Sequence, residues 1–134
     1  MNSSDRTSWN KHHVDYYSPE DGGGVMEEGD YKDGKKDGLW VYWYENGQKK
    51  REGNYKGDKR NGLWTWWYEN GQKELEGNVN DGKNDGLFTE WYENGQKKWE
   101  KDFKDGKFYG FWTFWDEDGN VTDTERYKNG KLVQ

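Results

Sequence analysis

The chain has 134 residues, enough for one domain, and 36% of them are charged, a fraction that by itself favours disorder. Against disorder stand 10 Trp, 10 Tyr and 5 Phe, so rings carry most of the apolar material. A net charge of -6 argues against a nucleic-acid partner, because phosphate binding requires clustered Lys and Arg, and the lack of cysteine excludes disulfides and thiolate chemistry.

The first 27 residues differ from the rest of the chain. Residues 1–13 are polar, have no period and hold both histidines, which predicts a flexible tail. They contain no apolar stretch of a signal peptide, and we expect a cytoplasmic protein. Residues 14–27 carry a degenerate form of a pattern that recurs later in the chain, with Asp21-Gly22-Gly23 at the turn. This predicts a degenerate capping repeat.

Repeats of 24 residues occupy most of the chain. The full units are 28–51, 52–75, 76–99 and 100–123, and a half repeat covers 124–134. The pattern that the units share has an Asp-Gly and an Asn-Gly turn signal between strand-length runs, and its glycine density excludes helix. The sequence therefore predicts an all-β protein, an elongated antiparallel meander in which β-hairpin repeats form a single sheet.

The turn after each aromatic run sets the expected register. Asn46-Gly47 is the pair that best fits a two-residue type I′ turn, which requires positive φ at both residues. The predicted pairs are Tyr44 with Lys49, Tyr42 with Arg51, and Trp40 with Gly53. Trp40 would then cover Gly53, and Trp64 would cover Gly77.

Because side chains alternate between the faces of a strand, one face collects most of the rings. We expect this face to be the core and also, since a single layer leaves it uncovered, an association face. Its residues include Trp40, Tyr42, Trp64, Trp66 and Tyr68. The expectation is a homodimer or a complex with an obligate protein partner, and the alternative is a monomer whose sheet closes on itself.

The other face carries one tryptophan per unit, beside threonines. The residues of this candidate binding ladder are Trp43, Trp67, Trp91 and Trp115, with Thr65, Thr89 and Thr113. Exposed rings in a row suit a protein hot spot, a sugar face or a quaternary ammonium group. The alternative is that sheet curvature buries them as a second core stripe.

The residue types of the repeats argue against catalysis. Residues 28–134 contain no Ser, His or Cys, and the recurrence of Glu45, Glu69 and Glu93 beside turns indicates solvated turn residues. His12 and His13 are neighbours without further ligands in sequence, which makes a poor metal site. We predict no catalytic residues, no metal site, no cofactor and no enzyme activity.

The motifs resemble a known repeat. Glu52-Gly53-Asn54-Tyr55-Lys56, Lys59-Arg60-Asn61-Gly62 and Tyr68-Glu69-Asn70-Gly71 are similar to the MORN repeat, a short β-hairpin unit, over residues 28–134. The usual second glycine is replaced by an aromatic residue at Trp40, Trp64, Phe88 and Trp112. That substitution is similar to the bacterial MORN-variant repeats of the YwqK-type antitoxin family.

The resemblance implies an elongated twisted sheet used for binding, in some members for dimerisation or membrane-lipid contact. We therefore expect a non-catalytic repeat scaffold that binds another protein, in an antitoxin-like or assembly role. The alternative is a module whose aromatic ladder binds a glycan, a choline-like group or a lipid headgroup.

Overall fold

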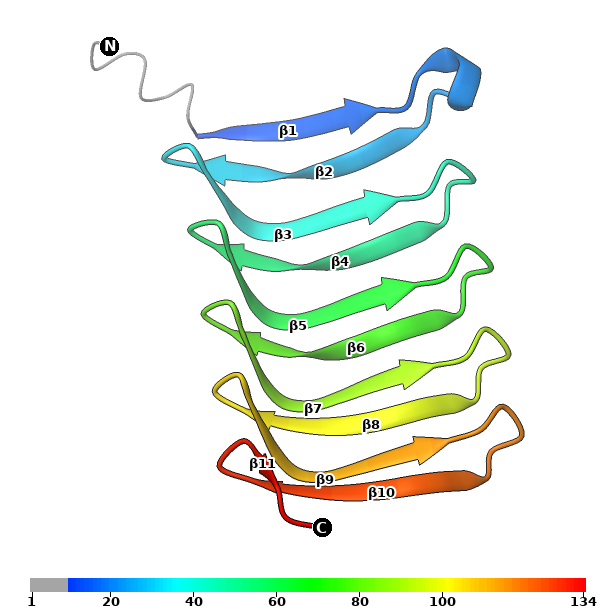
Figure 1. The fold of residues 1–134 in the computed structure, drawn as a ribbon. Helices are drawn as coiled ribbons and strands as arrows, with labels where there is room; N and C mark the ends of the chain where they lie inside the picture. Colours follow the sequence, from blue (N-terminus) through cyan, green and yellow to red (C-terminus); the bar gives the residue numbers. More distant parts are fainter. Residues whose placement is uncertain (1–9) are drawn as a thin grey trace.

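The computed structural model describes residues 10–134, which form one open sheet whose strands follow one another in chain order (Figure 1). The strands are β1 (Lys11–Tyr16), β2 (Val25–Lys32), β3 (Lys35–Trp43), β4 (Lys49–Lys56), β5 (Lys59–Trp67), β6 (Lys73–Asn80), β7 (Lys83–Trp91), β8 (Lys97–Lys104), β9 (Lys107–Trp115), β10 (Val121–Lys128) and β11 (Lys131–Leu132). A single 3-10 turn, η2 (Pro19–Asp21), joins β1 to β2. The predicted all-β antiparallel meander is confirmed. Within residues 10–134, no helix is long and apolar enough to cross a membrane.

The sheet begins earlier than the sequence predicted. Lys11, His12 and His13 open strand β1, where His12 lies opposite Asp30 and His13 opposite Gly29. The assignment of these three residues to a flexible tail is therefore wrong, and residues 1–9 of that tail lie outside the described residues. Polar composition misled the prediction, because β1 is an edge strand with only one neighbour.

The type I′ turns do not occur where the sequence predicted them. The type I′ geometry occurs at the Asp-Gly turns, where Asp33 and Gly34 both have positive φ, 53° and 79°. At the predicted site only Gly47 is left-handed, with φ 88°. There the loop has three residues, closed by the Tyr44 N–H donating to the Gln48 carbonyl at 2.8 Å. The type I′ prediction for Asn46-Gly47 is thus wrong.

The longer loop would shift the register by one residue, but a bulge restores it. Trp43, rather than Tyr44, lies opposite Lys49, and Lys50 is left without a partner in the ladder. Beyond the bulge, Tyr42 pairs with Arg51 and Trp40 with Gly53, as predicted. The hairpins β5–β6 and β7–β8 have the same bulge at the equivalent position.

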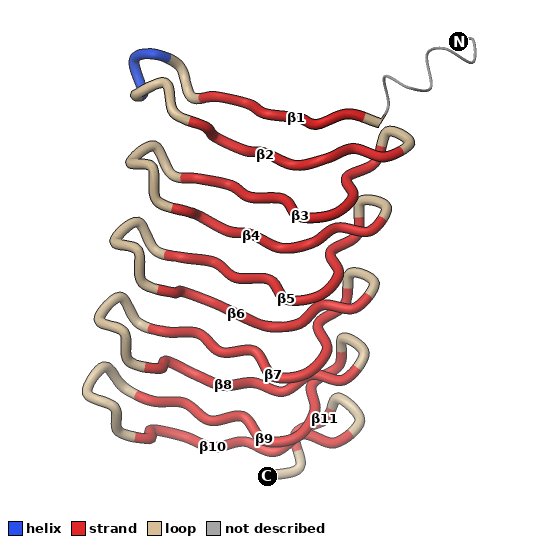
Figure 2. The backbone as a smooth tube through the Cα atoms, turned by 180° about the vertical axis from the view of Figure 1, so that it is seen from behind, coloured by secondary structure: helices blue, strands red, loops and turns tan. Residues whose placement is uncertain are grey.

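A second bulge bends β3, β5, β7 and β9 sharply near the turns at which they begin (Figure 2). The pairs Glu28 with Val41 and Asp30 with Asp37 leave extra residues on β3, among them Gly38 at φ 83°. The bend folds the start of the strand over one face and leaves Leu39 at the corner, 55% exposed.

This bent face holds the core, although the protein has only one layer. Trp40 and Trp64 are 0% exposed, and Tyr55 lies edge-on between their rings, with centroid distances of 6.3 and 5.0 Å. The other buried apolar residues are Tyr42, Val79, Phe88 and Trp112. Neighbouring repeats therefore bury one another's rings within the sheet.

Trp40, Trp64 and Phe88 each pack on a glycine of the preceding strand, not of the following one as predicted for Trp40 and Trp64. The Trp64 ring lies over Gly53, so close that a Cβ built there would be 2.2 Å from ring atoms. Its Nε1–H donates to the Asn54 carbonyl at 3.0 Å, which ties the indole to β4. Trp40 is held over Gly29 in the same way.

Burial corrects the predicted association face. Trp40, Tyr42 and Trp64 are buried by their own chain. The Arg60 guanidinium lies 4.9 Å from the centroid of the Trp64 ring, and the Lys36 ammonium lies 4.7 Å from that of the Trp40 ring. These three aromatic residues form the core and are not available to a partner. Sheet closure is not needed either, because the bend, the neighbouring rings and the cationic side chains cover them.

Candidate binding surfaces

The loops that follow the odd strands form one long side of the sheet, which we call the turn edge. It consists of the five-residue segments that begin at Tyr44, Tyr68 and Tyr92, together with the equivalent segment at Asp116. Three of these segments begin with a tyrosine followed by a glutamate, and each comes directly after the tryptophan that ends the preceding strand. The turn edge therefore combines rings and carboxylates.

The tyrosines of the turn edge connect successive repeats. Their hydroxyl groups donate to the carbonyl of the tryptophan in the next hairpin at 2.6–2.8 Å. The pairs are Tyr17 with Trp43, Tyr44 with Trp67, Tyr68 with Trp91, and Tyr92 with Trp115. Burial raises the pKa of the Tyr68 phenol above its ordinary value, and the carboxylates of Glu74 and Glu90 act in the same direction.

We expect Tyr68→Phe to lower the free energy of unfolding by about 1 kcal/mol at neutral pH, because it removes the hydrogen bond to Trp91. The raised pKa means that the unfolded state releases its phenolic proton first, so wild-type stability falls as pH rises from about 10. Tyr68→Phe should show a smaller alkaline loss, measured by urea unfolding at several pH values. Tyr16→Phe, at an exposed ring, should change neither quantity; an equal loss for both variants would contradict the role of the hydroxyl.

The asparagines stabilise the same edge. The Asn46 side chain accepts a hydrogen bond from the Gln48 N–H at 2.9 Å and donates to the Glu69 carbonyl at 3.0 Å. Asn70 and Asn94 repeat both contacts one and two units later. This residue is therefore selected by its amide contacts, since its φ is not positive.

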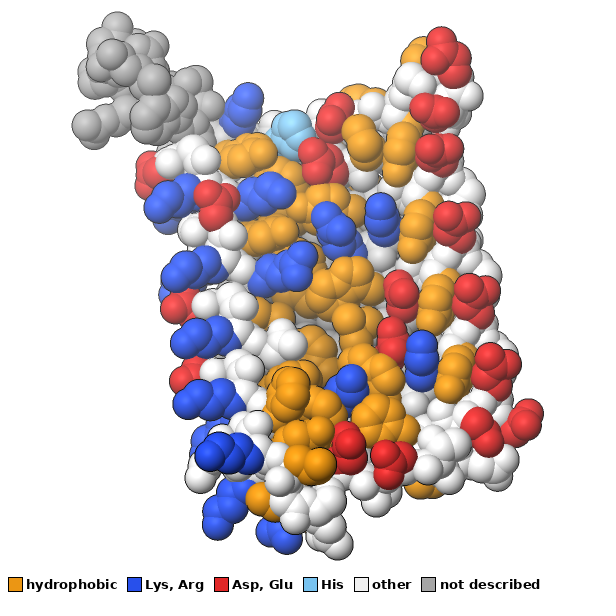
Figure 3. Space-filling view, in the orientation of Figure 1, with side chains coloured by type: hydrophobic (Ala, Val, Ile, Leu, Met, Phe, Trp, Pro, Cys, Tyr) orange, Lys and Arg blue, Asp and Glu red, His pale blue; other side chains and the backbone are white. Residues whose placement is uncertain are grey.

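An acidic column runs along the turn edge (Figure 3). Its exposed residues are Glu45, Glu69, Glu93 and Glu117. Two hollows lie between successive tyrosines of this edge, of about 470 Å³ beside Tyr17 and Tyr44 and about 390 Å³ beside Tyr68 and Tyr92. Sequence reasoning interpreted the recurrence of three of these glutamates as a sign of solvated turn residues, and their exposure agrees, but it did not identify them as one acidic surface.

The tryptophan ladder lies at the ends of β3, β5, β7 and β9, one residue before the segments of the turn edge. Trp43, Trp67, Trp91 and Trp115 are all half-buried. A lysine lies over each of the last three rings, with Nζ 5.8–5.9 Å from the centroid, for example Lys49 over Trp67. A space of about 400 Å³ separates Trp43 from Trp67, and one of about 340 Å³ separates Trp91 from Trp115. The rings are therefore reachable only in part, and their cation positions are already filled.

Two of the three threonines of the predicted ladder are buried in the sheet. Thr65 is only 5% exposed, and its hydroxyl donates to the Glu76 carboxylate at 2.8 Å. Thr89 is also buried, and Thr113 is half-buried. They alternate across the sheet with Glu52, Glu76 and Glu100, which shield them. The predicted contact role of Thr65 and Thr89 is therefore wrong.

The opposite long edge of the sheet is rich in lysine (Figure 3). Exposed lysines flank the Asp-Gly turns, including Lys35, Lys59, Lys83 and Lys107. Aspartates of the same turns partly offset this charge, as the 3.7 Å pair of Lys59 and Asp81 shows. The sheet thus presents edges of different electrostatic character.

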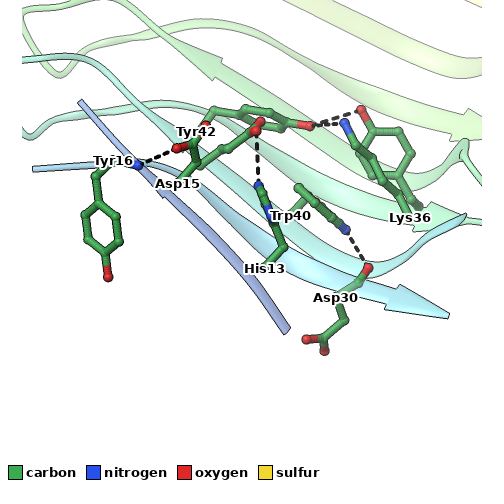
Figure 4. Close-up of polar contacts among 9 residues, drawn as sticks. His13, Asp15, Tyr16, Asp30, Lys36, Trp40 and Tyr42 are labelled. Atoms are coloured by element: carbon green, nitrogen blue, oxygen red, sulfur yellow. Dashed lines mark hydrogen bonds and ion pairs between the residues drawn. The ribbon is translucent and has the colours of Figure 1, made fainter. Parts of the chain in front are cut away.

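The first hairpin brings both histidines against carboxylates. His12 lies between Asp30 and Glu28, and hydrogen bonding to Asp30 and then Glu28 raises the pKa of its imidazole. His13 lies on the other face, beside Trp40 and near Asp15 (Figure 4). Sequence reasoning missed these neighbours because they come from the pairing of β1 with β2.

A comparison with protein families bears on the repeats. The model of the MORN repeat variant matches residues 36–56, 60–81 and 84–105. Each match covers an odd strand except its first residue and the whole of the following even strand, so the matching unit is a hairpin. A comparison with curated proteins found no match. These three hairpins are therefore similar to MORN-variant repeats, which are non-catalytic binding modules in general.

Proposed function

We propose that the protein is a non-catalytic cytoplasmic scaffold that binds another protein through its turn edge. The observation that carries the proposal is the column of exposed glutamates, which line the hollows between successive tyrosines of this edge. Exposed carboxylates in a row favour the Lys and Arg side chains of a partner, through ion pairing. The partner expected is therefore a basic protein surface, in accord with the net charge of -6.

Repetition makes this surface suited to an extended partner. Equivalent residues recur every two strands, which corresponds to a spacing of about 9.6 Å. Exposed single charges contribute little each, so useful affinity requires several repeats to act together. A partner that follows the edge would contact the equivalent glutamates of three or four repeats at once.

The second candidate is glycan binding at the tryptophan ladder, and the spaces between successive rings are the observation that favours it. A choline-like group is less suited, because Lys49, Lys73 and Lys97 already lie over three of the rings. The proposed scaffold function includes two more specific roles, antitoxin-like activity and self-association. Identifying the partner would distinguish between them.

Pull-down from the source cells with matched variants tests the proposal. The triple variant Glu69→Gln, Glu93→Gln, Glu117→Gln neutralises the turn edge without changing side-chain size, and we expect it to lose most of the captured protein. The control is Lys59→Gln, Lys83→Gln, Lys107→Gln on the opposite edge, which should retain the capture. Raising the salt concentration should weaken wild-type capture. Equal capture by the two variants, or glycan binding without any captured protein, would overturn it.

A further inference from the structure

Each hairpin contributes to the core a set of three facing side chains, which we call a packing cell. In the first hairpin polar residues occupy this packing cell. Its register aligns it with the hairpin β3–β4, because His13 lies opposite Gly29 as Trp40 lies opposite Gly53. In this alignment His13 takes the place of Trp40, Asp15 of Tyr42, and Glu27 of Arg51. The following cells hold Trp64, Trp66 and Leu75, and then Phe88, Glu90 and Trp99. Only the first cell consists entirely of metal-binding residue types.

These three side chains converge. One ligand atom from each of His13, Asp15 and Glu27 lies within 4.8 Å of the other two. The His13 Nε2 and Glu27 Oε1 are 3.3 Å apart, long for a strong hydrogen bond. Asp15 and Glu27 also lie directly opposite in the ladder, where two like charges are destabilising unless a cation lies between them.

The surroundings hold the histidine in place. Its ring stacks on Trp40, with centroids 5.7 Å apart and planes at 26° (Figure 4). The Tyr31 ring makes an edge contact with it at 5.6 Å and 79°. The side chains of His13 and Glu27 are only 27% and 28% exposed. An oxygen of Asp15 accepts the Tyr16 N–H at 2.9 Å, which orients that carboxylate. Such fixed neighbours are typical of metal ligands, whose orientation they determine.

We propose that His13, Asp15 and Glu27 form a binding site for a divalent transition metal, with Zn²⁺ as the ion of best fit. One imidazole nitrogen and two carboxylate oxygens are common zinc ligands, with bonds of about 2.0–2.2 Å. Tetrahedral geometry at that bond length separates ligand atoms by about 3.4 Å, close to the His13–Glu27 distance. The fourth position is open to water or to a donor from a partner. The ion would join β1 to β2 and neutralise the facing carboxylates.

His12 is a matched control within the same strand. It also contacts two carboxylates, but Glu28 lies at its Nε2, 2.6 Å away, and Asp30 at its Nδ1, 2.7 Å away. Because the two contacts are on opposite sides of the ring, they cannot converge on one ion. The chain has only two histidines and no cysteine, so nitrogen ligation has to use one of these two rings.

Isothermal titration of the untagged full-length chain with Zn²⁺ tests the site. We expect one ion per chain, with His12→Ala binding as wild type and Glu27→Gln at least about tenfold weaker. Glu27→Gln keeps the side-chain shape, so it separates metal binding from packing; the melting temperature without zinc provides the fold check. Zinc should raise the melting temperature of wild type but not of Glu27→Gln.

His13→Ala should also lose binding, and Mg²⁺ in excess should not compete, because it prefers oxygen ligands. Absence of Zn²⁺ binding by the wild type would overturn the proposal. So would a Glu27→Gln variant that binds as tightly as wild type, or a loss of binding in His12→Ala alone.

Discussion

Replacing Gly53 by alanine is expected to lower the free energy of unfolding by about 3 kcal/mol, although the change adds only one methyl group. The new Cβ would lie 2.2 Å from atoms of the Trp64 ring. That ring is completely buried and hydrogen-bonded to β4, so it cannot move aside without losing both its packing and the bond to Asn54. Urea unfolding followed by tryptophan fluorescence measures the loss.

Gly24→Ala is the control, since a Cβ there meets nothing within 4 Å and its φ is not left-handed. We expect a change within about 0.5 kcal/mol for this variant. Similar losses for Gly53→Ala and Gly24→Ala would show that the ring does not pack on the glycine.

Truncating the ring itself should have the largest effect of all. Trp64→Ala is expected to cost about 3–5 kcal/mol, because the indole is 0% exposed and neighbouring repeats share its contacts. Its cavity would open between Tyr55 and Trp66, whose rings lie 5.0 and 5.8 Å away. Chemical unfolding at equilibrium measures this loss.

Trp67→Ala removes the same atoms from the half-buried ladder and serves as the comparison. We expect less than half of the loss seen for Trp64→Ala, because water already reaches the ring and the space beside it. A larger loss for Trp67→Ala would mean that the ladder, and not the Trp64 face, is the principal core.

The architecture was predictable because two turn signals recur at a fixed period. A period of 24 residues with two turns leaves two short strands per unit, and adjacent antiparallel strands then form a meander. The turn type was not predictable from Asn46-Gly47 alone. The backbone preference of that pair competes with the amide contacts of Asn46 to Gln48 and Glu69, and the contact to Glu69 exists only in the stacked array.

The candidate surfaces were harder to predict than the fold. Alternation assigned Trp40 and Trp64 to the correct face, but it could not show that each indole leans onto the preceding strand and is covered there. The same limit misplaced Thr65, whose burial depends on glutamates from both neighbouring strands. The convergence of His13 with Glu27 required knowing that β1 exists, which its polar composition concealed.

The chain-order meander has a consequence for how the protein folds. Within residues 10–134 every strand pairs only with its immediate neighbours in sequence, so each strand pairing closes a short loop. Folding rates fall as contacting residues become more distant in sequence, and most all-β proteins are slow for that reason. This chain avoids the penalty: a nucleus can form at any hairpin and grow strand by strand in both directions, and unfolding should proceed from the two ends inward.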